Sequence, residues 1–282
     1  MSVSKRTLAA NMMVAASALV AGAGVATPAQ AIVVEGMQSM PRPDGAAVGQ
    51  WAGSSGVPVG PHWFITARHV GGAVGWWFLC NGQWYQAVEI REHPSLDLQM
   101  VRVAETFETY HRIATGVTSG DPCVMGGWGV TTSGPLADNA GYAWGGAHVE
   151  TWGANVIQNV SAIISVRFDA PGTNNAVPYE ASFAVNDSGG GLFTWGADGQ
   201  LELAAIAVSI SGFGQAAYGQ AGYAVRLESV KPWIMEVADP EAPVSSSIVA
   251  PRASLAAPGW VGIAGTAMFM TGLYGVRRRG RR

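Results

Sequence analysis

Residues 186–193 read Asn-Asp-Ser-Gly-Gly-Gly-Leu-Phe, a serine between an aspartate and a run of glycines. Two earlier stretches also place a reactive side chain beside an apolar run. Residues 64–70 read Phe-Ile-Thr-Ala-Arg-His-Val, and residues 93–100 read His-Pro-Ser-Leu-Asp-Leu-Gln-Met. In chain order the three stretches supply a histidine, an aspartate and a serine. Because a serine hydroxyl is a weak nucleophile without a neighbouring base, this set indicates nucleophilic chemistry.

The chain around these stretches, residues 32–238, consists of short apolar runs broken by Gly, Pro, Asn and Asp. Runs such as Leu98–Val103 alternate with a period of two, and β-branched and aromatic side chains recur in them, as is typical of half-buried strands. Pro232 suits the first turn of a short helix near the end of this segment. Many closely spaced strands predict an all-β domain, either a sandwich or barrels.

The ordered set of motifs closely resembles the three signature regions of the trypsin-like (chymotrypsin-fold) serine endopeptidases. Further matches extend the resemblance over nearly all of residues 32–238: Gly126–Gly129, Ala207–Gly212, Gly222–Leu227 and the pair Trp233 and Ile234. The resemblance implies two six-stranded antiparallel β-barrels, about 32–125 and 126–238, with the active site between them and a closing C-terminal helix.

The same resemblance assigns roles to individual side chains. His69 would take the proton of the attacking Ser188 and pass it to the leaving amine, while Asp97 would hold the imidazole in the right tautomer. The backbone N–H groups of Asn186 and Ser188 would form the oxyanion hole. The family usually has glycine where Asn186 stands, and we expect the hole to survive because asparagine tolerates a positive φ.

The resemblance also implies how the N-terminus and the substrate pocket are built. Cleavage after Ala31 would expose Ile32, whose α-ammonium would pair with Asp187, although Val34-Glu35-Gly36 departs from the glycines usual after Ile-Val. The pocket would be formed by small residues, namely Ser182 at the floor with Ser209, Ser211 and Gly222. With no carboxylate at the floor, cleavage after a medium or large apolar residue is expected in place of cleavage after Arg or Lys.

Both ends of the chain are predicted to be sorting segments. Residues 1–31 combine Lys5 and Arg6, an apolar run and a small-x-small cleavage site, as in a signal peptide. Residues 239–258 are rich in Pro, Ala and Ser and predict a tether. Residues 259–282 are an apolar segment with an arginine tail, which suits a membrane span with the arginines on the cytoplasmic side.

This C-terminal layout resembles bacterial PEP-CTERM or GlyGly-CTERM sorting signals, which implies an envelope sorting enzyme as a partner. The alternatives are an uncleaved N-terminal anchor and a terminal helix that folds onto the domain. We expect an exported protein of the cell envelope, either secreted or anchored by this segment.

Composition excludes several classes of protein. With 49% hydrophobic and 12% charged residues the chain is not disordered, and with 2 cysteines it is not a disulfide scaffold. All 19 acidic residues lie between Glu35 and Glu241, so the middle of the chain is acidic and a nucleic-acid surface is not expected. The metal motif His-Glu-x-x-His and paired Cys-x-x-Cys motifs are missing from the sequence, so neither a metal nor a cofactor is expected.

Two questions stay open at the level of sequence. Cys80 and Cys123 either form a disulfide, as an oxidising compartment allows, or remain two separate thiols. The expected function is a serine endopeptidase that acts on a protein or peptide. Its competitors are a non-catalytic surface binding protein that kept the fold and an esterase on the same scaffold.

Overall fold

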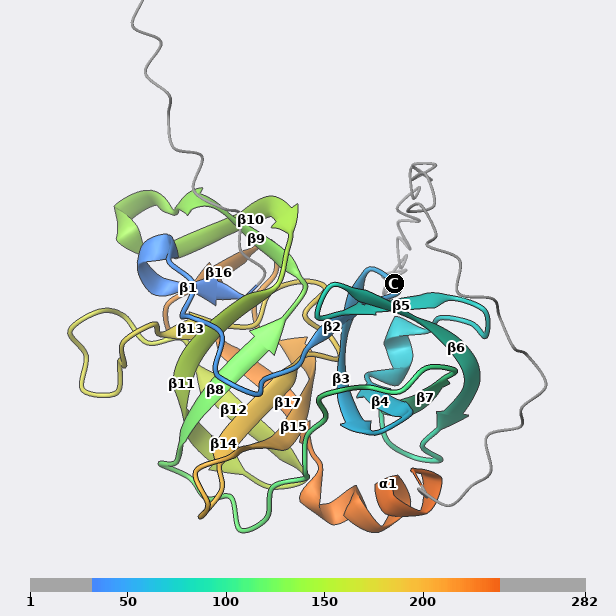
Figure 1. Ribbon diagram of the computed structural model, residues 1–282. Helices are drawn as coiled ribbons and strands as arrows, with labels where there is room; N and C mark the ends of the chain where they lie inside the picture. The colour runs from blue at the N-terminus through green and yellow to red at the C-terminus, as the bar shows by residue number, and fades with distance from the viewer. Residues whose placement is uncertain (1–31, 239–282) are drawn as a thin grey trace, which may run out of the picture. The chain divides into compact units, whose positions relative to one another are not determined.

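The computed structural model describes residues 32–238, which fold mainly as two closed antiparallel β-barrels of six strands each (Figure 1). The predicted all-β, two-barrel architecture is confirmed at this level. The strands of the first barrel are, in spatial order, β2 (Gly49–Trp51), β3 (Ser54–Gly60), β4 (Trp63–Thr66), β7 (Gln99–Val103), β6 (Gln83–Glu92) and β5 (Trp77–Cys80). Those of the second are β11 (Thr151–Val160), β12 (Ile163–Arg167), β17 (Ala221–Arg226), β15 (Leu201–Ile210), β14 (Gly191–Trp195) and β8 (Pro122–Gly127).

An aromatic cluster fills the first barrel. The rings of Phe64 and Phe78 stack with centroids 4.0 Å apart, and Trp51 meets Phe64 edge-on at 5.2 Å. The β5–β6 hairpin turns through Asn81 and Gly82, both at positive φ, which matches the right-handed twist of its strands. Phe64, which starts the stretch that contains His69, is thus anchored in the aromatic core of this barrel.

The division between the barrels lies earlier than the predicted position. Strand β8 starts at Pro122 and belongs entirely to the second barrel, so a boundary at 125/126 would cut through it. Two small sheets add to this half: β1 (Val33–Val34) pairs with β13 (Ala181–Ser182), and β10 (Gly141–His148) lies between β9 (Val130–Pro135) and β16 (Gln215–Ala217). Neither small sheet was predicted from the sequence.

One hydrophobic cluster joins the barrels. It includes Ile65 and Met100 of the first barrel and Phe193 and Leu203 of the second. Helix α1 (Lys231–Val237) has Pro at its start, as predicted, and buries Ile234 in the same cluster. This shared apolar core packs residues of both barrels against one another.

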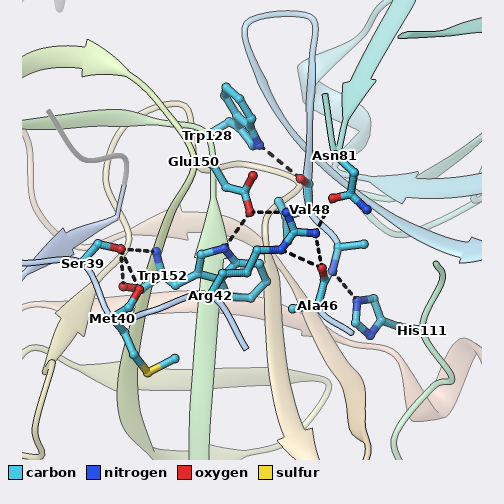
Figure 2. Close-up of polar contacts among 11 residues, drawn as sticks. Ser39, Met40, Arg42, Ala46, Val48, Asn81, His111, Trp128, Glu150 and Trp152 are labelled. Atoms are coloured by element: carbon cyan, nitrogen blue, oxygen red, sulfur yellow. Dashed lines mark hydrogen bonds and ion pairs between the residues drawn. The ribbon is translucent and has the colours of Figure 1, made fainter. Parts of the chain in front are cut away.

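The segment that connects β1 to β2 adds polar contacts between the barrels, shown in Figure 2. Arg42 forms an ion pair with Glu150 at 3.4 Å, just before β11, and a hydrogen bond with Asn81 in the β5–β6 turn. Arg42 thereby contacts both barrels at once.

Buried His111 makes a second polar link between the barrels. Its Nε2 accepts the N–H of Ala47 at 3.0 Å, and its Nδ1–H donates to the carbonyl of Leu201 at 3.3 Å. Burial lowers the pKa of His111 and keeps the ring neutral.

Three predicted segments lie outside the described residues, namely the signal peptide 1–31, the tether 239–258 and the apolar segment 259–282 with its arginine tail. Among residues 32–238, none of the helices has the length and apolar character needed to cross a membrane.

Candidate active site

The three predicted catalytic side chains meet between the barrels. His69 lies in the short 3-10 turn η2 (Arg68–Val70) that follows β4, and Asp97 lies just before β7. Ser188 lies in the loop that leads into β14 of the second barrel. Nδ1 of His69 donates to Oδ2 of Asp97 at 2.5 Å, and Nε2 of His69 is 2.7 Å from Oγ of Ser188. An unbroken chain of hydrogen bonds thus joins acid, imidazole and hydroxyl.

Backbone contacts fix the orientation of this chain. The N–H of His69 donates to Oδ1 of Asp97 at 2.9 Å, so the carboxylate holds both the ring and the backbone of the histidine. Across the barrels, the N–H of Ser55 in β3 donates to the carbonyl of Ser188 at 3.0 Å. Ser188 is therefore tied to the barrel that carries His69.

Gly189 is the residue that lets the serine loop come this close. At its φ of +84°, an added Cβ would lie 2.1 Å from the carbonyl oxygen of Ser55 and 2.2 Å from Oγ1 of Thr66. Those distances are far shorter than any van der Waals contact. The glycine after the serine is thus required by the approach of the first barrel as well as by its own backbone conformation.

Asn186 adopts the backbone conformation that the sequence predicts for it. Its φ is +68°, in the left-handed region that asparagine tolerates better than most residues. Within the described chain, the amide N–H groups of Asn186 and Ser188 make no hydrogen bond. Both residues line the same cavity, so two backbone donors without another acceptor are available there for an oxyanion.

Replacement of Asn186 by glycine is accordingly expected to change kcat/KM by less than about threefold, since the backbone already has the required φ. Replacement by valine, which is strained at positive φ, is expected to lower kcat by about 10²-fold through misplacement of one oxyanion donor. Steady-state kinetics of the two variants measure this difference. A tenfold gain for Asn186→Gly would show that the native asparagine distorts the hole.

Asp187 is fully buried next to the start of the described chain. Its Oδ1 accepts the N–H of Gly129 at 2.9 Å and its Oδ2 that of Ala184 at 2.8 Å. Burial raises the pKa of Asp187 to about 7, and the two amide hydrogen bonds lower it in part. Among residues 32–238, Asp187 forms no ion pair with a cationic side chain.

Ile32 lies beside this carboxylate and is completely buried. A Cβ built on Gly127 would lie 2.3 Å from Oδ1 of Asp187 and 3.5 Å from Cγ1 of Ile32, so both residues converge on that glycine. Residues 34–36, which depart from the glycines usual in the family, fit into the fold. The N–H of Gly36 donates to Oη of Tyr142 at 2.8 Å. The side chain of Ile32 thus lies near the carboxylate of Asp187, and the ion pair with its α-ammonium stays a prediction.

A cavity of about 290 Å³ opens beside Ser188 and Asn186. Its remaining lining is mostly apolar and comes from β10, the loop before Ser188, and the end of β15 with the residues after it: Trp144, Phe183, Ala184, Val185, Asp187, Ala207, Val208, Ser209, Ile210, Gly212 and Phe213. Of the predicted pocket residues, Ser209 lines this cavity.

Ser182, Ser211 and Gly222 are not among the lining residues. Oγ of Ser182 donates to the carbonyl of Phe183 inside the core, and Oγ of Ser211 accepts the N–H of Ala221. The sequence did not predict that Phe183, Trp144 and Phe213 line the cavity. The predicted pocket was taken from positions that match the family, and such a match does not show which neighbouring side chains reach the cavity.

The two cysteines do not form a disulfide. Cys80 belongs to β5 in the core of the first barrel and Cys123 to β8 in the core of the second, and both are free, buried thiols. Burial raises the pKa of Cys80 to about 12 and that of Cys123 still further, so both stay protonated and inert. The sequence left two possibilities open, and in the structure Cys80 and Cys123 are two separate thiols.

Two comparisons with known proteins give no match. No protein-family model matches the chain, and a search of curated proteins finds no match. Among the described residues, no group of three or more His, Cys, Asp and Glu side chains is placed to hold a metal ion. The two closed six-stranded barrels are consistent with a chymotrypsin-like fold.

Proposed function

We propose that this protein is an exported serine endopeptidase that hydrolyses peptide bonds through an acyl-enzyme intermediate. The observation that carries the proposal is the hydrogen-bonded chain from Asp97 through His69 to Ser188, with distances of 2.5 and 2.7 Å. Export is proposed from residues 1–31, and envelope attachment and a sorting enzyme from residues 239–282.

The reaction follows from these contacts. Oγ of Ser188 attacks the carbonyl carbon of the substrate while its proton moves to Nε2 of His69. The carbonyl oxygen becomes an oxyanion that accepts from the N–H groups of Asn186 and Ser188. The proton on Nε2 then passes to the leaving amine as the carbon–nitrogen bond breaks. A water molecule, deprotonated by His69, attacks the acyl ester and returns Ser188 to its starting form.

Labelling with diisopropyl fluorophosphate tests the proposal. The mature protein is expected to gain one diisopropylphosphoryl group on Ser188, located by peptide mass mapping, and the His69→Ala variant to gain none in the same time. His62→Ala is the matched control. His62 precedes β4 in the chain, whereas His69 follows it, and Nδ1 of His62 bonds to the carbonyl of Glu105.

The labelled enzyme must also cleave a peptide. Turnover of a peptide bond distinguishes the endopeptidase from an esterase, which would hydrolyse only ester analogues of the same peptide. A protein that is folded but neither labelled nor active would be a binding protein on this scaffold, and the proposal would be wrong.

Signal peptide cleavage is proposed to activate the enzyme directly. Removal of residues 1–31 would leave an α-ammonium on Ile32, whose side chain is already buried next to Asp187. The new charge would then pair with a carboxylate that has only amide partners among the described residues. N-terminal sequencing of the active form is expected to start at Ile32, and an active form that starts later in the chain would contradict this step.

The pH dependence of stability should differ between processed and extended forms. In the extended form, which keeps residues before Ile32, Asp187 has a folded-state pKa of about 7. This lies above its unfolded value of about 3.9. The folded state then binds more protons than the unfolded state between these values, so the free energy of unfolding falls as pH rises from about 4 to 7. The loss is on the order of 4 kcal/mol.

Asp187→Asn in the extended protein should remove this loss. In the form that starts at Ile32 the ammonium compensates the charge and the loss should be much smaller. Urea unfolding at pH 4.5 and 7.5 measures both effects. Equal pH dependence in the extended protein and its Asp187→Asn variant would contradict the assignment.

A further inference from the structure

Asp97 lies in a loop that belongs to no helix or strand. The loop, residues 93–98, joins β6, which ends at Glu92, to β7, which begins at Gln99. Glu92 and Gln99 pair with each other, so the loop closes a hairpin between neighbouring strands. The place of the Asp97 carboxylate therefore depends on contacts made within this loop and around it.

The first residue of the loop, His93, organises it. Nδ1 of His93 accepts the backbone N–H of Leu96 at 3.0 Å and that of Ser95 at 3.2 Å. The backbone N–H of His93 donates to the carbonyl of Leu98 at 2.9 Å, which closes the loop. Since Pro94 has no N–H, Nδ1 accepts from both backbone donors that precede the aspartate in this loop.

Two further contacts join His93 to neighbouring elements. Its carbonyl accepts from Nη1 of Arg68 at 3.3 Å, and Arg68 directly precedes His69 in η2. Its ring meets the ring of Trp233 in α1 edge-on, with centroids 4.8 Å apart. His93 thus contacts the turn that carries His69 and the closing helix, as well as its own loop.

The hydrogen bonds to Ser95 and Leu96 require a neutral imidazole. Nδ1 accepts an N–H only while it carries no proton, so the proton of the ring is on Nε2. Partial burial, and after it the positive charge of Arg68, lower the pKa of His93. Both effects favour the neutral ring, and the two hydrogen bonds are therefore kept near neutral pH.

Asp97 has little freedom to move. Its Oδ1 accepts the backbone N–H of His69 at 2.9 Å while its Oδ2 accepts Nδ1–H at 2.5 Å, so one carboxylate matches two donors of one residue. A misplacement of about 1 Å in such a site costs about 10²-fold in rate. Whatever fixes the shape of the loop therefore affects the hydrogen bonds that orient His69.

We propose that His93 is a positioning residue for Asp97: Nδ1 of His93 holds the loop in the shape that presents the carboxylate to His69. This proposal rests on the proposed function, because the placement of Asp97 matters to catalysis only if His69 and Ser188 react. It adds to that function a side chain that acts through Asp97.

Amide side chains of two lengths separate the acceptor atom from the rest of the ring. Oδ1 of an asparagine lies as many bonds from Cα as Nδ1 of a histidine, and it has two lone pairs for the two N–H groups, whereas the acceptor of a glutamine lies one bond farther away. Asparagine at position 93 should therefore replace the acceptor, and glutamine or alanine should not.

Steady-state hydrolysis of a peptide p-nitroanilide with an apolar residue before the cleaved bond measures the effect. His93→Asn is expected to keep kcat within about threefold of the unmodified mature protein. His93→Gln and His93→Ala are each expected to lower kcat by about tenfold or more, with KM changed by less than about twofold, because the misplaced carboxylate affects the reaction and not substrate binding. The glutamine variant decides the question if the alanine variant does not fold.

Trp233→Leu is the matched control, since it removes the ring contact and leaves Nδ1 of His93 in place. Thermal unfolding is measured on the same samples. Trp233→Leu is expected to lower the midpoint of unfolding while kcat stays within about threefold of the unmodified protein. If kcat instead followed the midpoint of unfolding through the whole set of variants, His93 would have a purely structural role and the proposal would be wrong.

The remaining outcomes separate this proposal from the proposed function. A His93→Asn variant as slow as His93→Ala, or a His93→Gln variant as fast as the unmodified protein, would overturn the role of Nδ1. Labelling of Ser188 by diisopropyl fluorophosphate in the unmodified protein would still uphold the endopeptidase. If the unmodified protein were not labelled, both the proposed function and the positioning role of His93 would be overturned.

Discussion

Replacement of Ser188 or of His69 by alanine is expected to lower kcat by about 10⁶-fold, and replacement of both to lower it no further. The reason is that the two side chains act in one step. Oγ of Ser188 is 2.7 Å from Nε2 of His69, and neither the hydroxyl without its base nor the base without its nucleophile forms the acyl-enzyme. Once either side chain is gone, replacing the other therefore causes no further loss of kcat.

Single-turnover hydrolysis of a peptide p-nitroanilide with an apolar residue before the cleaved bond, by the two single variants and the double variant, measures these losses. His62→Ala provides the baseline. It should stay within twofold of the unmodified enzyme, because the His62 ring lies outside the hydrogen-bonded chain and its Nδ1 bonds to the Glu105 carbonyl. If the two single losses multiplied in the double variant, Ser188 and His69 would act independently, which the proposed mechanism forbids.

Replacement of Asp97 by asparagine should lower kcat by about 10⁴-fold, as in the serine-protease triad from which the roles are taken. The aspartate accepts the Nδ1–H of His69 at 2.5 Å and so leaves Nε2 without a proton. An asparagine amide can instead donate to Nδ1, which puts the proton on Nε2. That nitrogen then has no lone pair for the proton of Ser188.

The loss should arise from the tautomer and leave the fold intact. The remaining Oδ1 of an asparagine still accepts the backbone N–H of His69, which Asp97 holds at 2.9 Å. Thermal unfolding should therefore change little, while kcat falls with KM nearly constant. Asp121→Asn, at an exposed loop aspartate bonded to Thr118, controls for the loss of one negative charge. A loss of less than tenfold for Asp97→Asn would contradict the role of this carboxylate.

Much of the candidate site could be predicted because its signals are local. His69, Asp97 and Ser188 each lie beside a short apolar strand that is visible in the sequence, and the order of the three motifs resembles one family of folds. The positive φ of Asn186 was expected from the resemblance, because asparagine tolerates the conformation that glycine has there in the family. The short helix with Pro232 in its first turn likewise depended on neighbouring residues alone.

Features that depend on packing between distant segments were not predictable in this way. Whether Cys80 and Cys123 pair depends on which barrel core each strand enters, and the structure puts them in different cores. The sheet of β9, β10 and β16 joins segments about seventy residues apart, with only weak turn signals between them.

The sequence by itself determined the strand-rich class, the chemistry of the reactive side chains and the order in which the chain supplies them, because each of these is written in a few consecutive residues. The tertiary structure alone decided that the imidazole lies within hydrogen-bonding distance of both partners, and that Phe183 is among the residues that line the cavity beside the serine. Those outcomes depend on how the two barrels and the strands β13 and β17 pack. Such packing minimises empty space among side chains that are far apart in the chain.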